Sequence, residues 1–265
     1  MRPSRVHSAV ASYFHHTSWR GLTSSLIPEQ GQVCRQNYAI VRIILKPLAG
    51  VWLDDVSSLV APSAVLHGFD VNDRMFPPIR PKNVSLSLNS MTNLPEEWTG
   101  RFDFINQRFL IAALTHKDWI DAIANLTRVL HPGGWIQLME PVMWRAGPVT
   151  AKHVKLLQAL FDARGFDLEI HERLPQLLLK EGYVNIQTEY HQVPLGKWKG
   201  EISERGRDVF MGTFRGMRGP ILLSGGLGIV DGEEQLNKLL DDMEAEWDNT
   251  EGSELTMCVV YAQKP

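Results

Sequence analysis

Three side chains of this sequence have the chemistry of a general base. His15 and His16 lie near the N-terminus, and Glu140 ends an apolar run, WIQLM. An imidazole or a carboxylate can take the proton from an acceptor hydroxyl or indole N–H. Each residue also has a structural interpretation, since surface histidines are common and a glutamate in this place often caps or pairs with a neighbour. Both interpretations stay open at the level of sequence.

The sequence does not indicate other kinds of catalytic site. Its nine histidines form no His-x-x-x-His pair and no His/Cys cluster, so we expect no metal site. Two cysteines, Cys34 and Cys258, are too few for a disulfide framework. That usage is typical of a reducing compartment, and we expect a cytoplasmic protein. There is no Gly-x-Ser-x-Gly elbow, and Gly225–Gly228 has no clear strand before it, which predicts a turn and not a nucleotide-binding loop.

Composition narrows the class of partner. The 265 residues carry 27 Lys and Arg against 30 Asp and Glu, a net charge of −3. Binding to nucleic acid phosphates requires a cationic excess, so this balance argues against a nucleic acid partner. Hydrophobic residues make up 44%, enough for a core, and no apolar run approaches the ~18 residues of a membrane-spanning helix. We therefore expect a small-molecule substrate, with neither nucleic acid nor membrane as partner.

Strands and helices alternate from residue 38 onward, and these elements must position the candidate residues. β-Branched and apolar runs predict strands over 38–45, 64–71, 84–88, 102–105, 135–139, 184–191 and 255–262. Amphipathic runs predict helices over 50–60, 117–130, 150–163, 171–181, 202–216 and 232–247. The spacing predicts a three-layer, Rossmann-like α/β fold with a mostly parallel central sheet and a helical insertion. We expect a single domain over 38–265.

The first 28 residues contain no acidic side chain and are rich in Ser and Arg. Such a composition is found in mitochondrial transit peptides. The alternative is a helix or lid that packs on the body of the protein. Tyr13, Phe14 and Trp19 favour this alternative, so we expect residues 1–37 to form an N-terminal helical or lid segment.

Five stretches, in this order and spacing, resemble one family. They are AVLHGFDVNDRMFP (64–77), LPEEWTGRFDFINQRFL (94–110), RVLHPGGWIQLMEP (128–141), LKEGYVNIQTEYHQVPLGKW (179–198) and VVYAQKP (259–265). Together they resemble the fungal class I S-adenosylmethionine-dependent methyltransferases, in the group that contains the regulator of secondary metabolism LaeA. The resemblance implies a class I methyltransferase fold and S-adenosyl-L-methionine as cofactor. It also implies a small hydrophobic intermediate of fungal specialised metabolism as substrate.

The family's glycine-rich loop after the first strand is degenerate in this chain. The family pattern is roughly LDvGtGTGvW, and residues 43–52 read IILKPLAGVW. Ile44 replaces the acid that would hold the cofactor's amino group, Lys46 and Leu48 replace two glycines, and only Gly50 remains. Glycine lets the backbone approach a ligand without a Cβ clash. The resemblance therefore implies a cofactor contact at Gly50 within a loop whose cofactor binding is weakened or lost.

The resemblance assigns further site residues at the ends of the predicted strands. Asp70 would accept hydrogen bonds from the ribose hydroxyls. Asn89 would accept one from the adenine amino group, where the family usually has an acid. Asn106 would contact the cofactor, and Arg108 and Trp144 would line the substrate pocket. The alternatives are a solvated turn for Asp70, a structural contact for Arg108 and core packing for Trp144.

Three functions are compatible with these features. The first is a methyltransferase that acts on a small molecule of fungal specialised metabolism. The second is a cofactor-independent, pericyclase-like catalyst of cyclisation or rearrangement on the same fold, and the degenerate loop favours it. The third is a non-catalytic regulator similar to LaeA, which the short chain without a basic patch disfavours. Asp70 and Gly50 favour the first, because they retain part of the cofactor pattern.

Overall fold

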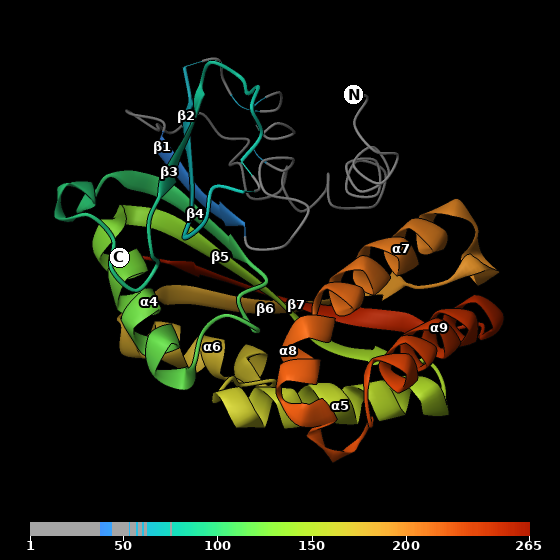
Figure 1. The fold of residues 1–265 in the computed structure, drawn as a ribbon. Coiled ribbons are helices and arrows are strands. Elements are labelled where there is room, and N and C mark those ends of the chain that lie inside the picture. Colours follow the sequence, from blue (N-terminus) through green and yellow to red (C-terminus); the bar gives the residue numbers. More distant parts are fainter. Residues whose placement is uncertain (1–37, 44–52, 54–56, 58–59, 61–62, 75) are drawn as a thin grey trace.

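The computed structural model describes residues 38–43, 53, 57, 60, 63–74 and 76–265. These residues form one seven-stranded sheet in the order β3-β2-β1-β4-β5-β7-β6 (Figure 1). Strands β1 to β5 run parallel, and β7 is antiparallel to both β5 and β6. The strand bounds are Tyr38–Ile43 (β1), Val65–Asp70 (β2), Val84–Leu88 (β3), Phe102–Arg108 (β4), Leu130–Arg145 (β5), Val184–Pro194 (β6) and Glu254–Gln263 (β7). The mixed, mostly parallel sheet confirms the predicted α/β fold class.

Helices follow β4, β5 and β6 in the chain. Helices α4 and α6 lie against one face of the sheet, whereas α7, α8 and α9 form the helical insertion between β6 and β7 (Figure 1). The helix bounds are His116–Val129 (α4), Pro148–Arg164 (α5), Ile170–Lys180 (α6), Glu201–Gly216 (α7), Arg218–Leu223 (α8) and Glu233–Asn249 (α9). Short 3-10 turns occupy Glu96–Trp98 (η1), Lys197–Lys199 (η2) and Gly225–Gly228 (η3). Among the described residues, none of the helices has the length and apolarity needed to span a bilayer.

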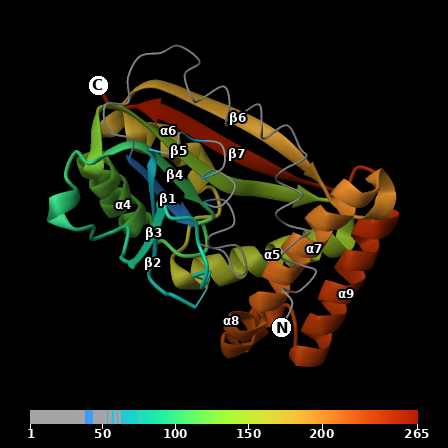
Figure 2. The ribbon, with the colours of Figure 1, turned by 90° about the horizontal axis from the view of Figure 1, so that it is seen from above.

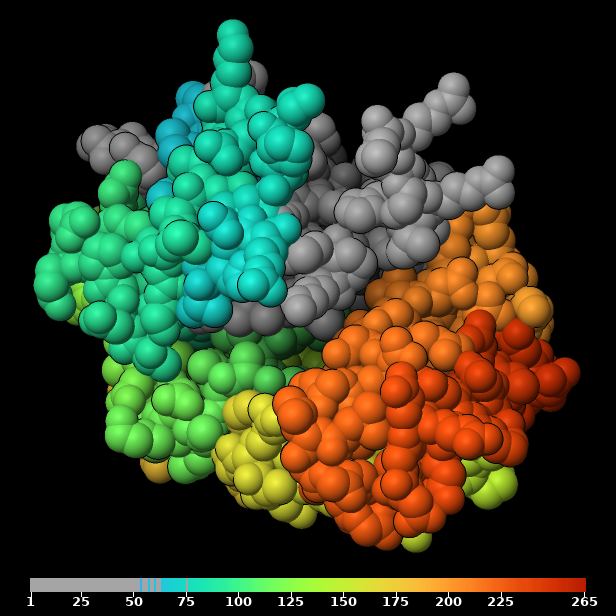
Figure 3. All heavy atoms as spheres, viewed as in Figure 1, coloured from blue at the N-terminus to red at the C-terminus, as the bar shows by residue number. Residues whose placement is uncertain are grey.

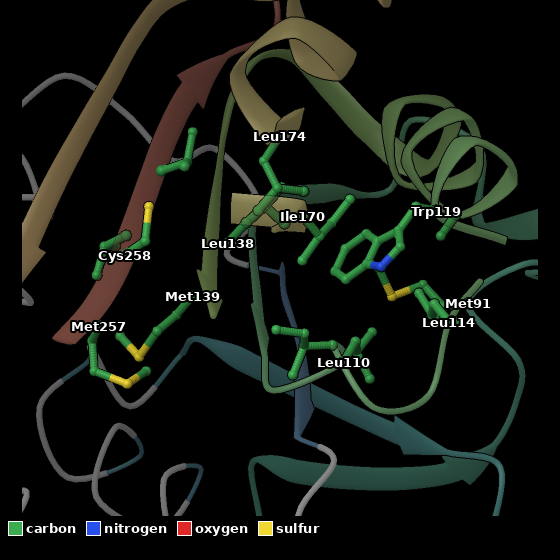
Figure 4. Packing of buried hydrophobic residues seen from close by; sticks show 14 of the residues in the cluster. Met91, Leu110, Leu114, Trp119, Leu138, Met139, Ile170, Leu174, Met257 and Cys258 are labelled. Atoms are coloured by element: carbon green, nitrogen blue, oxygen red, sulfur yellow. The ribbon is translucent and has the colours of Figure 1, made fainter. Parts of the chain in front are cut away.

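Helix α4 shows how the local sequence sets both the start of an element and its buried face. Thr115 caps the helix: its side chain accepts from the Asp118 N–H, and the Asp118 side chain accepts from the Thr115 N–H at 3.0 Å. The buried stripe of the helix includes Trp119. The Trp119 indole points toward Leu138 of β5 and Ile170 of α6 (Figure 4). This packing fixes the helix, and the loop before it, against the sheet.

Several strands are longer than the sequence pattern predicts, β4 and β5 among them. The strand predicted over 102–105 continues to Arg108, and the one predicted over 135–139 runs from Leu130 to Arg145. The extension of β5 beyond Met139 pairs with β7, whose pairing with β5 runs from Trp135 to Arg145. Asn106, Gln107 and Arg108 therefore do not follow β4, as predicted, but belong to it. Side chains alternate between the two faces of a strand, so Gln107 lies on the opposite face from its two neighbours.

The helical insertion forms a separate group beyond the ends of β6 and β7 (Figure 2). On the face shown in Figure 3, it lies at the corner opposite the part of the chain around β2 and β3. Arg207 of α7 is 6% exposed and donates to Asp208 at 2.7 Å and to Asp248. The bond to Asp248 connects α7 to the end of α9. The turn predicted at Gly225–Gly228 is the 3-10 turn η3, in which three glycines have positive φ.

Candidate functional site

The carboxyl ends of the parallel strands meet at one edge of the sheet, where α/β proteins of this type bind ligands. Asp70 is the last residue of β2, and Asn89 follows directly after β3. The Asn89 N–H donates to the Asp70 carbonyl oxygen at 3.0 Å, so the two residues are neighbours. Asn106 and Arg108 lie in the last three residues of β4. The tertiary structure thus brings four of the predicted site residues to the same edge.

The Asp70 side chain begins a tight turn. Its Oδ1 accepts from the Asn72 N–H at 3.1 Å, and the Asn72 Oδ1 accepts from the Arg74 N–H at 2.8 Å. Both turns are of the Asx type, in which a side chain caps the backbone two residues later. Asp70 itself is half-buried. The turn holds its carboxylate at the strand end, so the turn and the ribose interpretations of Asp70 are compatible.

The Asn89 amide is held through its nitrogen. Nδ2 donates to the Ser87 Oγ at 2.8 Å. With Nδ2 engaged in this bond, Oδ1 is the end of the amide left to accept a hydrogen bond. An amide oxygen is a neutral acceptor, which matches an amino group without adding charge. The geometry fits the role that the resemblance implies for Asn89.

Asn106 and Arg108 form a buried polar pair. The Arg108 Nε donates to the Asn106 Oδ1 at 3.1 Å, and the two residues are 5% and 0% exposed. The Asn106 Nδ2 has no hydrogen-bond partner among the described residues. A buried donor left unpaired costs ~1–3 kcal/mol, so each such group requires an explanation, and a bound ligand is one. The Asn106 amide thus offers a donor, fixed by Arg108, at the end of the strand.

The chain turns sharply after Arg108. Phe109 has φ 58°, in the left-handed region that a bulky residue rarely adopts. Its N–H still donates to the Met139 carbonyl oxygen at 3.0 Å, which extends the pairing of β4 with β5 by one residue. Strained residues of this kind cost of order 1–3 kcal/mol and are held in place by their surroundings. The surroundings here include Glu140.

Glu140 is completely buried and accepts three hydrogen bonds. Its Oε1 accepts from the Leu110 N–H at 2.8 Å and from the Gln107 Nε2, and its Oε2 accepts from the Ile111 N–H at 3.0 Å. Burial raises the pKa of Glu140 to about 7, against the effect of these three donors. Both oxygens are thus used to hold the segment after β4. A catalytic role for Glu140 stays a prediction, and the contacts favour a positioning role.

Trp144 lies in an aromatic cluster near the end of β5. Its ring is 5.1 Å from Phe214 of α7 and 6.0 Å from His153 of α5, and it is nearly buried. Neither the Trp144 Nε1 nor either ring nitrogen of His153 has a partner within the described part of the chain. Burial lowers the pKa of His153 to about 3, so the ring is neutral. These contacts fit the core-packing alternative, and the substrate-pocket role of Trp144 stays a prediction.

The remaining predicted site residues are His15, His16 and Gly50. All three lie outside the described residues, as do the N-terminal segment 1–37 and most of the helix predicted over 50–60. Within the described ranges, no three His, Cys, Asp or Glu residues gather in a way that could hold a metal ion.

Sequence reasoning assigned no role to two polar residues that the structure places at this edge. Gln107 was expected beside Asn106 and Arg108, but its bond to Glu140 depends on the pairing of β4 with β5, which no local pattern reveals. Ser87 alternates with Leu86 and Leu88 on an edge strand and resembles a solvated position. The period-two alternation VSLSL was the available signal, since it places Ser85 and Ser87 on one face.

None of the family models for known proteins matches the chain. Individual relatives do match it, and they agree with one another. The chain is 31% identical over 223 residues to the N-methyltransferase verN of Clonostachys rogersoniana, and the match covers 82% of this chain and 76% of verN. It is 26% identical over 230 residues to the N-methyltransferase gliN of Aspergillus fumigatus, with 82% of this chain and 79% of gliN covered.

Solved structures agree on the fold. Phosphoethanolamine N-methyltransferase 2 of Haemonchus contortus, solved with S-adenosyl-L-methionine, superposes with a TM-score of 0.55 at 13% identity, covering 97% of this chain and 56% of that chain. A putative methyltransferase of Bacillus halodurans superposes with a TM-score of 0.54 at 11% identity, covering 92% and 98%. At such identities the likeness shows the fold alone. Taken with the sequence relatives, it places this chain in the family of fungal class I methyltransferases of secondary metabolism.

Proposed function

We propose that this protein transfers a methyl group from S-adenosyl-L-methionine to a nitrogen atom of a small hydrophobic intermediate. The observation that carries the proposal is the buried Nδ2 of Asn106 at the end of β4, which has no hydrogen-bond partner among the residues that the structure describes. It lies at the same sheet edge as Asp70 and Asn89. Nitrogen as the acceptor atom is suggested by the related proteins verN, gliN and sirN, which are named N-methyltransferases.

The residues present fit the adenosine half of the cofactor. The Asp70 carboxylate would accept from the ribose hydroxyls, and the Asn89 Oδ1 would accept from the adenine amino group. When bound, the cofactor supplies a methyl group on a positively charged sulfur. The loop over 43–52, where the sequence departs most from the family, lies largely outside the described residues.

The chain's own contribution to the reaction is positioning. Methyl transfer between two bound molecules needs the acceptor atom and the methyl group in line, and little else. The Asn106 Nδ2 provides a donor whose direction is set by the bond from the Arg108 Nε. That donor suits a carbonyl oxygen of the acceptor or a polar atom of the cofactor. The segment after β4, tied by Glu140, would form one wall of the acceptor site.

Calorimetric titration of the full chain with S-adenosylmethionine and S-adenosylhomocysteine tests the proposal. We expect micromolar binding of both. Absence of binding at millimolar ligand would overturn methyl transfer and favour the cofactor-independent catalyst, an alternative that rests on Ile44, Lys46 and Leu48 in the loop. Restoring the family pattern with Ile44→Asp, Lys46→Gly and Leu48→Gly is the companion variant. If binding is weak, we expect this triple change to strengthen it.

We further propose that the protein acts in the cytoplasm on a small molecule, with neither nucleic acid nor membrane as partner. The buried free thiol of Cys258 and the net charge of −3 support this proposal. Fractionation of the source cells checks the compartment, and enrichment in mitochondria or membranes would contradict it.

A further inference from the structure

A chain of hydrogen bonds connects the interior of β2 to the Asn89 amide. His67 of β2 lies opposite Ser85 of β3 in the register of the sheet. Its Nδ1 is 2.8 Å from the Ser85 Oγ, and its Nε2 is 2.8 Å from the Ser87 Oγ. The Ser87 Oγ in turn accepts from the Asn89 Nδ2 at 2.8 Å. Four polar side chains on two strands are thereby joined in one line.

One assignment of the hydrogens satisfies every contact in this line at once. In it, the Ser85 hydroxyl gives its single hydrogen to the Leu66 carbonyl oxygen at 3.3 Å. Ser85 then accepts from the His67 Nδ1–H at 2.8 Å. The Nε2 of a neutral ring is then an acceptor, so the Ser87 hydroxyl donates to it. Because Ser87 has given its hydrogen to His67, it can only accept from Asn89, and it accepts from the amide nitrogen.

The His67 imidazole is suited to keep these hydrogen bonds in their directions. Burial, together with the charge of Arg101, lowers the pKa of His67 to about 4, so the ring is neutral at pH 7 with one donor and one acceptor. Aromatic packing fixes its plane. The Trp98 ring meets it edge-on, at 4.7 Å between centroids and 74° between planes, and Phe102 lies 6.3 Å away. The ring therefore cannot easily turn to exchange its two nitrogens.

We propose that His67 and Ser87 are positioning residues that lock the Asn89 amide with its oxygen toward the cofactor, and so select adenine over a 6-oxo purine. The inference rests on the proposed function, because it assumes that Asn89 meets the adenine base. The oxygen and nitrogen of an amide are nearly the same size, so only a hydrogen-bond partner decides which faces a ligand. An oxygen there accepts from a 6-amino group, whereas a nitrogen there would donate to a 6-oxo group.

The test compares two ligands and one small substitution. The ligands are S-adenosylhomocysteine and S-inosylhomocysteine, which carries a 6-oxo group in place of the 6-amino group. We expect the wild type to prefer the adenosyl compound about tenfold, the size of one good hydrogen bond. In Ser87→Ala the amide is free to turn. We expect its affinity for the adenosyl compound to fall about threefold to tenfold and the preference to shrink to about twofold or less.

Three further variants separate this role from a structural one. Ser90→Ala is the matched control, because Ser90 adjoins Asn89 and bonds to Thr92 outside the line of bonds. It should keep the tenfold preference. Ser87→Thr retains a hydroxyl and should restore the preference. His67→Phe keeps the aromatic packing but removes both ring nitrogens, and should weaken the preference as Ser87→Ala does.

The outcomes distinguish the two proposals. A wild type that binds neither compound at millimolar concentration would overturn the proposed function itself. A wild type that binds the adenosyl compound preferentially, with the same preference in Ser87→Ala, would leave the function standing and overturn the role of the His67–Ser87 line. A general loss of stability cannot imitate the expected result, because it would weaken both ligands alike and leave their ratio unchanged.

Discussion

The Glu140 Oε1 lies 2.8 Å from the backbone nitrogen of Leu110, although thirty residues separate the two in the chain. The same carboxylate holds the Ile111 N–H and the Gln107 side chain, so β5 is tied to the segment that leaves β4. This segment begins with the strained Phe109 and follows the polar pair Asn106–Arg108. One buried acid therefore sets the geometry of the segment that leaves β4.

Glu140→Ala should lower both stability and turnover. The change leaves the Leu110 and Ile111 N–H groups buried without an acceptor and opens a small cavity. Together these effects should reduce the free energy of unfolding by about 3 kcal/mol. Urea denaturation measures the loss. Glu251→Ala, at an exposed position in the turn after α9, is the matched control and should change stability by less than about 0.5 kcal/mol. Equal stability of the two variants would contradict the role of Glu140 in holding the segment after β4.

The raised pKa of Glu140 predicts a pH dependence of stability. The folded state binds its proton up to pH 7, whereas the unfolded state releases it near 4.5, so between these values the folded state holds more protons. The stability that protonated Glu140 contributes is therefore complete below about pH 4.5 and is lost as pH rises through 7. The loss is about 3 kcal/mol.

Glu140→Gln isolates this effect, because the amide does not titrate. From pH 4.5 to 8, the free energy of unfolding of the wild type should fall relative to that of the variant. Urea titrations at several pH values measure this difference. A difference that is flat with pH would show that the Glu140 pKa is not raised.

Asn106→Leu should separate binding from stability. It removes a buried Nδ2 that has no partner among the described residues, but it also removes the acceptor of the Arg108 Nε, so the two effects oppose each other and the melting temperature should change little. The affinity for S-adenosylhomocysteine should nevertheless fall about tenfold, if that nitrogen faces the ligand. Gln107→Leu, on the opposite face of β4, is the comparison. It should lower the melting temperature, because Glu140 loses a donor, and leave the affinity for S-adenosylhomocysteine unchanged. Calorimetry and thermal melting of both variants provide the check. Asn106→Leu without any loss of affinity would remove this residue from the site.

Gly196→Ala should destabilise the helical insertion. A Cβ at Gly196 would lie 1.9 Å from the Trp247 carbonyl oxygen, and the backbone there has φ 98°. Neither feature tolerates a side chain, so we expect a loss above about 3 kcal/mol. Gly212→Ala, inside α7 with nothing within 4 Å, makes the same chemical change and should instead stabilise by up to about 1 kcal/mol. Thermal melting that ranks the two variants the other way would contradict the close approach of η2 and α9.

Much of the fold followed from local patterns. The capped, amphipathic run at 117–130 became α4, and the alternating strands at 64–71 and 84–88 became β2 and β3, with each bound within two residues of its prediction. Hydrophobic periodicity is a property of neighbouring residues, so it can be read without knowing the fold. The family resemblance rested on the same local stretches. The extent of β4 and β5 could not be predicted in this way, because partner strands decide where a strand ends.

The sequence by itself determined the fold class, the family and the positions of Asp70 and Asn89 at the ends of strands. It also showed how far residues 43–52 depart from the family's loop. Only the tertiary structure decided what the polar side chains do. The sequence proposed Glu140 as a base, and the structure added that it is buried and accepts three hydrogen bonds that hold the segment after β4. No sequence pattern indicated a role for His67, and the register of β2 and β3 placed it between two serines. The physical reason is that a polar group's role depends on its partners and its burial, and strand pairing brings those from distant parts of the chain.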